Sequence, residues 1–233
     1  MNEAVNEVIE AMKLLSDPAR ITMIASYAPT SMEVLGATNP DIKNVIREVK
    51  QKYREWDERS WIEFCKALVD TGIFECQGLA YELLGRNRKL LDALSRKDVQ
   101  DLAKHLDNWA SVDGFSVGIY GVMWRKGVIK DPDIQQLLKS NDHWQRRVAV
   151  VSTVALNLKS RGGTGDTTRT LAVCEAVVED HHDMIQKALS WALRELSKRD
   201  REAVLGFVDR HQNKLAGRVL REVTHKLEYG TKN

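Results

Sequence analysis

The chain has 233 residues, 43% hydrophobic and 29% charged, a balance that suits a soluble globular protein with a substantial core and argues against disorder. Its 35 basic and 33 acidic residues leave a formal net charge of +2, so any basic binding surface must come from uneven placement of charge. Cys65, Cys76 and Cys174 stand alone without C-x-x-C spacing, which indicates buried thiols in a reducing compartment. Neither a disulfide nor a zinc site is expected.

The sequence shows no pattern typical of a membrane span or a secretion signal. Its N-terminus has no basic segment followed by a long apolar core, and the longest apolar stretch, "VAVVSTVAL", is interrupted by Ser152 and Thr153. We therefore expect a cytoplasmic protein with no membrane partner.

Apolar residues recur with the helical period along most of the chain. This pattern predicts helices within residues 16–27, 39–53, 60–72, 96–107, 131–141 and 200–211. Asn39 and Asp131 are predicted N-caps, each followed by proline at the first helical position. No segment alternates as a strand would. The glycine-rich loop "KSRGGTGDTT", residues 159–168, lacks Gly-Lys-Ser/Thr and is interpreted as a connection only.

The spacing of the helices indicates pairs, because Trp109, Trp144 and Trp191 each lie on an apolar helix that follows a shorter amphipathic one. A helix pair every ~35 to 47 residues is typical of HEAT-like repeats. The sequence therefore predicts an all-α fold: a right-handed solenoid with a concave face, formed by one repeat domain over residues 1–233. A plain helical bundle is the alternative.

The stretch "DNWASVDGFSVGIYGVMW", residues 107–124, divides into two helical stripes. The predicted core stripe is Val112, Phe115, Ile119 and Met123. The second stripe has mixed chemistry and is expected to border the core: Trp109, Asp113, Ser116 and Tyr120. Taken alone, Trp109 could be a core anchor and Asp113 a surface carboxylate.

Two later helices divide in the same way. In "HDMIQKALSWALRELSK" the predicted core is Ile185, Leu189, Ala192 and Leu196, and the second stripe is Lys187, Trp191, Arg194 and Lys198. That second stripe is either a solvated face with one buried indole or a groove for nucleic-acid phosphates. In "NDHWQRRVAVVSTVALNLK" the predicted core is Trp144, Val148, Val151, Ala155 and Leu158. Arg146 and Arg147 are expected to project near the helix start, where anions are favoured.

Three segments, "NWASVD", "HWQRRVAVV" and "IQKALSWALRELSK", resemble in order and spacing the best-marked segments of the AlkD-like DNA alkylation repair proteins. "EVLGATNPDIKNVIREV" and "LVDTGIFECQGLAYELL" resemble earlier repeats of that family. The resemblance implies a curved helical solenoid that holds duplex DNA. It also implies a glycosylase that removes cationic N3- and N7-alkylated purines without full base flipping.

The resemblance assigns roles to individual residues. It implies that Asp113 is the catalytic aspartate, that Trp109 and Trp191 are active-site tryptophans, and that Arg147 contacts the DNA backbone. The sequence departs from the family at Asn108 and Ala110, where relatives often have an aromatic residue and an acid. It departs again at Asp183 and Met184, where they often have an aromatic pair.

Charged residues elsewhere complete the expected site. Lys187, Arg194, Lys198 and Arg146 are expected to bind phosphates, and Lys43, with Arg47, either does so or only makes its helix soluble. Lys159 and Arg161 have the same two interpretations. "DHHDM" is interpreted as a helix start, because adjacent histidines point about 100° apart and suit no metal. We expect no cofactor, a monomer, and double-stranded DNA with alkylated purines as the partner.

Two other functions fit the same residues. A non-catalytic solenoid that binds distorted or branched DNA would show salt-sensitive binding without base release. A protein-binding scaffold would keep its DNA affinity unchanged after Lys187→Ala with Arg194→Ala.

Overall fold

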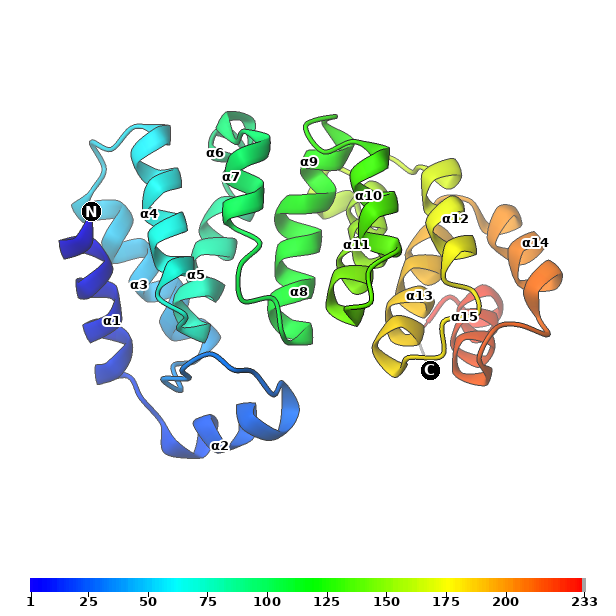
Figure 1. Ribbon diagram of the computed structural model, residues 1–233, viewed down its shortest axis with the longest axis horizontal. Helices are drawn as coiled ribbons and strands as arrows, with labels where there is room; N and C mark the ends of the chain where they lie inside the picture. Colours follow the sequence, from blue (N-terminus) through cyan, green and yellow to red (C-terminus); the bar gives the residue numbers. More distant parts are fainter. Residues whose placement is uncertain (232–233) are drawn as a thin grey trace. The chain divides into compact units, whose positions relative to one another are not determined.

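The computed structural model describes residues 1–231 and is almost entirely helical (Figure 1). No strand occurs in this range; an isolated bridge pairs Glu33 with Ile73. The chain forms two compact units, Met1–Ile119 and the part from Tyr120 onward. The all-α class is thus confirmed, and the expectation of a single repeat domain stays a prediction.

The first unit contains the helices α1 (Asn2–Leu14), α2 (Pro18–Tyr27), α3 (Asn39–Lys52), α4 (Glu58–Asp70), α5 (Phe74–Gly85), α6 (Arg88–Ala93), α7 (Arg96–Asp101) and α8 (Trp109–Phe115). Helix α5 packs against α3, α4 and α8, so α3, α5 and α8 form one row. In Figure 1, α2 runs across the direction of α1 and α4 instead of alongside them. A single α2 residue, Ile24, is buried.

The second unit contains α9 (Gly121–Arg125), α10 (Asp131–Leu138), α11 (His143–Asn157), α12 (Thr167–Ala176), α13 (Asp183–Leu196), α14 (Arg201–His211) and α15 (Gly217–Tyr229), with a short 3-10 turn η2 (Lys159–Arg161). Helix α11 packs against α13, and α13 packs against α15. The shorter helices α10 and α12 precede α11 and α13 and pack against them. This is the pairing that the sequence predicts.

Most predicted core residues are buried. Val112, Phe115, Ile119 and Met123 are all buried, as are Ile185, Leu189, Ala192 and Leu196. In α11 the prediction holds for Val148, Val151 and Ala155, whereas Trp144 and Leu158 are partly exposed at the ends of the segment. The three cysteines are also buried, and burial raises the pKa of Cys76 to about 12.

Two predicted helix caps are wrong by one residue. Helix α3 is capped by Thr38, whose hydroxyl accepts a hydrogen bond from the Asp41 amide, so Asn39 is already helical. Helix α10 is capped at Lys130, whose amide donates to Asp133. Asp131 instead accepts a hydrogen bond from the indole nitrogen of Trp124, at 2.7 Å. The Thr38-x-x-Asp41 spacing is that of a capping box, so the α3 cap could have been recognised in the sequence, whereas the contact between Trp124 and Asp131 could not.

None of the helices in residues 1–231 combines the length and the apolar character that crossing a bilayer requires.

Candidate active site

Trp109 and Asp113 lie one turn apart on α8, and both are partly exposed. The helix begins here because the Asn108 side chain accepts a hydrogen bond from the Ser111 amide at 2.9 Å. Behind the pair, Val112 and Phe115 are buried in the core. The first unit therefore presents an indole and a carboxylate on the accessible side of one well-anchored helix.

Trp109 is held by a residue that the sequence analysis did not identify. Its Nε1–H donates to the main-chain carbonyl of Tyr27 at 2.8 Å. The two rings meet edge to face, with their centroids 4.9 Å apart. Tyr27 is the last residue of α2 and is 65% exposed. No local pattern connects residues so distant in sequence, so this contact could not be predicted.

A π-helical turn, η1 (Ser116–Tyr120), follows α8 directly. The predicted polar stripe is wrong beyond Asp113, because Ser116 and Tyr120 are buried. The Ser116 hydroxyl donates to the carbonyl of Val112 at 2.6 Å, so it is satisfied within the helix. Residues 115–124 are all buried, so no polar face continues beyond Asp113 through this turn.

Arg146 and Arg147 do not project from α11, which corrects the expectation from the sequence. Arg146 pairs with Asp180 at 2.7 Å and also donates to the carbonyl of Ser140 at 2.8 Å. Arg147 is buried, and it donates to the carbonyl of Met184 at the start of α13. Both guanidinium groups fold back because carbonyl and carboxylate oxygens from neighbouring segments lie within reach.

The predicted second stripe of α13 lies on one side of the helix, but its cations are paired with acids. Lys187 forms an ion pair with Asp183 at 2.7 Å, and Lys198 forms one with Glu195 at 2.6 Å. Trp191, between them, is partly exposed. The Asp183–Lys187 pair has the i,i+4 spacing that stabilises helices, so this partner could have been recognised in the sequence.

Arg194 connects α13 to α15. Its Nε donates to the Ser190 hydroxyl at 3.1 Å, and its Nη2 lies 3.7 Å from Glu222. The Ser190 hydroxyl in turn donates to Glu222 at 2.6 Å. Only 14% of the Arg194 side chain is exposed, and burial lowers the pKa of its guanidinium. Its main interactions are structural.

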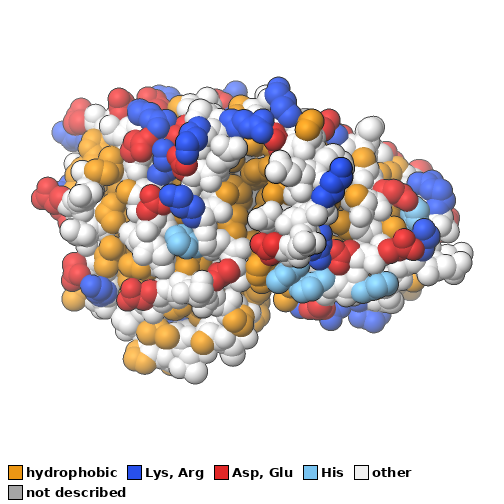
Figure 2. Space-filling model, viewed as in Figure 1, with side chains coloured by type: hydrophobic (Ala, Val, Ile, Leu, Met, Phe, Trp, Pro, Cys, Tyr) orange, Lys and Arg blue, Asp and Glu red, His pale blue; other side chains and the backbone are white. Residues whose placement is uncertain are grey.

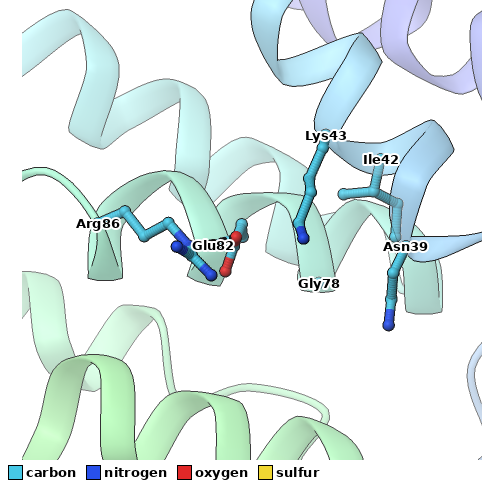
Figure 3. Close-up of a pocket in the computed structure, with 6 residues that line it drawn as sticks. All are labelled: Asn39, Ile42, Lys43, Gly78, Glu82 and Arg86. Carbon is cyan, nitrogen blue, oxygen red and sulfur yellow. Dashed lines mark ion pairs between the residues drawn. The ribbon is translucent and has the colours of Figure 1, made fainter. Parts of the chain in front are cut away.

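Lys43 lies in a groove of the first unit, between α3 and α5. The groove is a cavity of about 250 Å³ that continues into a second one of about 270 Å³. The side chains of Lys43, Glu82 and Arg86 reach toward the same opening (Figure 3). Glu82 and Arg86 form an ion pair with each other. Lys43 and Lys50 have no carboxylate partner in the described part of the chain, so the groove keeps an excess of positive charge.

The glycine-rich loop is a structural connection, as predicted. The amides of Gly162, Gly163 and Gly165 all donate to main-chain carbonyls of the preceding segment. Arg125 and Arg199 bind further carbonyls of the loop and of the α11 end. These amides are therefore not available to bind phosphate in the manner of a P-loop.

The surface carries no extended region of one charge on the face shown in Figure 2, where Lys and Arg side chains alternate with Asp and Glu. Residues 1–231 also contain no group of three or more His, Cys, Asp or Glu side chains arranged to hold a metal ion. His182 caps α13 through its ring nitrogen, which confirms that "DHHDM" is a helix start.

Comparisons with known proteins bear on the family and on the fold of this chain. Residues 8–227 match the family model described as DNA alkylation repair enzyme. A solved structure titled as a predicted DNA alkylation repair enzyme from Enterococcus faecalis superposes with a TM-score of 0.71 at 17% identity, covering 92% of this chain and 97% of that one. This similarity confirms the helical-repeat fold. No curated protein sequence matches.

Proposed function

The chain belongs to the family of DNA alkylation repair enzymes, and from this premise we propose that it is a monofunctional DNA glycosylase. The proposed reaction is hydrolysis of the N-glycosidic bond of cationic N3- and N7-alkylated purines in duplex DNA. The observation that carries the proposal is the pair of Trp109 and Asp113, one turn apart on α8 and both accessible.

The chemistry explains why a carboxylate is useful here. Alkylation at N3 or N7 gives the purine a positive charge, so the base is already a good leaving group and needs little general acid catalysis. As the C1′–N bond stretches, the deoxyribose gains oxocarbenium character. We assign Asp113 to stabilise that charge, or to position the water that attacks C1′. Water is the only co-reactant: the electrons of the C1′–N bond leave with the base, which becomes neutral, and the proton lost by the attacking water passes to Asp113 or to solvent.

The aromatic residues have a complementary role in the proposal. Trp109 and Trp191 hold the sugar and add cation–π stabilisation of ~0.5 to 2 kcal/mol. The fixed orientation of the Trp109 indole, bonded to Tyr27 through its N–H, supports this assignment because a face held in place loses little entropy on binding.

The basic residues differ in how available they are to bind DNA phosphates. Lys43, in the positively charged groove between α3 and α5, is accessible for this role. Lys187 and Lys198 are exposed but paired, so each would exchange a carboxylate for a phosphate. Arg146, Arg147 and Arg194 are bound to protein oxygens, so in the proposal they hold α11 and α13 in place instead of binding phosphates.

The proposal takes the protein to act as a cytoplasmic monomer, with HEAT-like repeats as the scaffold. Its substrate is double-stranded DNA that contains alkylated purines.

Base release from a defined lesion tests the proposal. A duplex with a single N7-methylguanine is incubated with the wild type, with Asp113→Asn and with Asp57→Asn. Asp57 is an exposed N-cap carboxylate of α4, and asparagine caps a helix equally well. We expect release by the wild type and by Asp57→Asn, and none by Asp113→Asn.

Binding of the same duplex completes the test. Asp113→Asn should keep most of its affinity, because the carboxylate is assigned to the transition state and not to the phosphates. Unchanged release by Asp113→Asn would refute the catalytic assignment. Salt-sensitive binding with no release by the wild type would instead support a non-catalytic DNA-binding protein.

A further inference from the structure

The segment after α2 is fastened to the residues just before α8 by one carboxylate. Asp107 accepts hydrogen bonds from the hydroxyl of Thr30 and from both the amide and the hydroxyl of Ser31, each at 2.6 Å. The Asn108 side chain donates a further bond at 3.2 Å. Donors thus converge on Asp107 from a segment 76 residues away in the sequence.

The carboxylate is well suited to this task. Burial raises the pKa of Asp107, but the hydrogen bonds from Ser31 and Thr30 outweigh that effect and lower the pKa overall. Asp107 is therefore ionised at neutral pH, and an ionised carboxylate accepts hydrogen bonds on both oxygens. Bonds of this charge-assisted kind are about twice as strong as neutral ones.

The fastened segment also carries the partner of Trp109. Tyr27, whose carbonyl accepts the indole N–H, lies only three residues before Thr30. Helix α2 has few other attachments: Ile24 is its one buried residue, and Arg20 donates to the Ala37 carbonyl at 2.9 Å. The position of the Tyr27 carbonyl therefore depends strongly on the bonds to Asp107.

We propose that Asp107 is a positioning residue for Trp109: by holding Thr30 and Ser31 against the start of α8, it fixes the Tyr27 carbonyl and with it the orientation of the indole. The role in catalysis rests on the proposed function, because it needs Trp109 to contact the deoxyribose. The structural part, in which loss of the Asp107 carboxylate releases the Trp109 indole, is independent of the reaction.

The first test is hydrogen exchange of the tryptophan indoles, observed by NMR in Asp107→Ala. The Trp109 signal, assigned from its absence in Trp109→Phe, should shift and exchange faster with solvent. The Trp124 indole, which donates to Asp131 in the second unit, serves as an internal reference and should not change. A Trp109 signal that stays as in the wild type would overturn the proposal.

A second variant tests whether the effect comes from the hydrogen bonds to Asp107 and not from a general loss of stability. Thr30→Val combined with Ser31→Ala removes both hydroxyl donors and keeps the carboxylate, and it should reproduce the Trp109 exchange of Asp107→Ala. Combining all three changes should add little, because residues of one network are not additive. Asp57→Ala, which removes an N-cap carboxylate elsewhere in the same unit, controls for a general loss of stability.

The kinetic readout connects the segment to the reaction. With the N7-methylguanine duplex, Asp107→Ala should lower kcat by about 10- to 100-fold, the effect of a reacting group misplaced by about 1 Å, with KM nearly unchanged. A changed indole with full kcat, or an equal kcat loss in Asp57→Ala, would overturn the positioning role. Absence of release by the wild type would refute the proposed function alone, and indole exchange would still decide the structural part.

Discussion

The indole of Trp109 is hydrogen-bonded to the main chain of Tyr27, although the two residues are 82 positions apart in the sequence. The N–H of one binds the carbonyl of the other at 2.8 Å, and their rings meet at an interplanar angle of 87°. A partly exposed tryptophan is usually free to change rotamer. Here the ring is constrained by both contacts, so its accessible face has a defined direction.

Substitution of Tyr27 separates the contribution of its ring from that of its carbonyl. Tyr27→Ala keeps the carbonyl but removes the edge-to-face contact, and we expect it to lower the free energy of unfolding by about 0.5 to 1.5 kcal/mol. Tyr27→Phe keeps the ring and should match the wild type. Urea denaturation measures both, and single-turnover base release should fall several-fold only in Tyr27→Ala. Equal losses in the two variants would instead assign the effect to the hydroxyl.

Asp183 restrains two cations, because it pairs with Lys187 at 2.7 Å and with Arg218 at 3.3 Å. The hydrogen bond from Lys187 lowers the pKa of Asp183, so the acid is charged at neutral pH. If these cations bind DNA phosphates, Asp183→Asn should strengthen binding. The slope of log K against the logarithm of the salt concentration should become more negative by about one for each of the two cations that gains a phosphate.

Asp209→Asn provides the matched control for that measurement. Asp209 is exposed on α14 in the same unit, and its substitution changes the net charge equally. Titration of undamaged duplex at several salt concentrations checks the prediction. An equal increase in affinity in the two variants would show that total charge, and not release of Lys187 and Arg218, determines affinity.

The sequence predicts the buried faces of the helices better than the surroundings of the charges. Val112 and Leu189 can be assigned to the core because the helical period alone decides which side of a helix meets its neighbours. Arg147 cannot be placed correctly, because the Met184 carbonyl that binds it lies on another helix. The α3 cap is misplaced for a different reason: Thr38 and Asn39 both cap helices well, and the prediction did not use the Thr38-x-x-Asp41 capping box that favours Thr38.

In the candidate site, too, local features can be predicted and contacts between distant residues cannot. Trp109 and Asp113 can be identified because their spacing and their family resemblance are both local features of the chain. The roles of Tyr27 and Asp107 cannot be predicted from the sequence, because both depend on contacts between residues far apart in the chain. In addition, Tyr27 acts through its main-chain carbonyl, which every residue has.

Asp98 makes the stability of the first unit depend on acid pH. Burial alone would raise its pKa, but hydrogen bonds from Arg59 and Ser95 outweigh burial and lower the pKa to about 2. A carboxyl with a depressed pKa in the folded state contributes stability above its ordinary value of 3.8, and that contribution is lost as the pH falls toward 2.

The expected contribution of Asp98 to stability follows from the shift in its pKa, since each pKa unit corresponds to about 1.4 kcal/mol. Asp98→Asn should therefore lower the free energy of unfolding by about 2 kcal/mol at pH 7, and the difference from the wild type should shrink to a small part of that value by pH 2. Urea denaturation from pH 7 to pH 2 measures this difference. Glu48→Gln, at an exposed position of α3 in the same unit, should follow the wild type throughout. A pH-independent difference for Asp98→Asn would show that packing, and not ionisation, is responsible.

Gly163 is required by packing in the connection after α11. A Cβ atom at this position would lie 2.7 Å from the carbonyl oxygens of Ala155 and Leu156 and from the amide nitrogen of Leu158. All three are main-chain atoms, so they cannot move aside as a flexible side chain would. Gly163→Ala should consequently lower the free energy of unfolding by about 1 to 3 kcal/mol, the usual cost of overpacking.

Gly217→Ala is the opposite case and serves as the control. Gly217 begins α15, and a Cβ there meets nothing within 4 Å. Alanine favours the helix and restricts the unfolded chain, so this variant should be as stable as the wild type or more stable by up to about 1 kcal/mol. Thermal and urea denaturation of the two variants would detect the difference in sign. Equal stability of Gly163→Ala and Gly217→Ala would contradict the prediction. It would mean that the end of α11 relaxes enough to admit a methyl group, and that the hydrogen bonds from Arg199 to the carbonyls of Asn157 and Gly163 are weak enough to allow this movement.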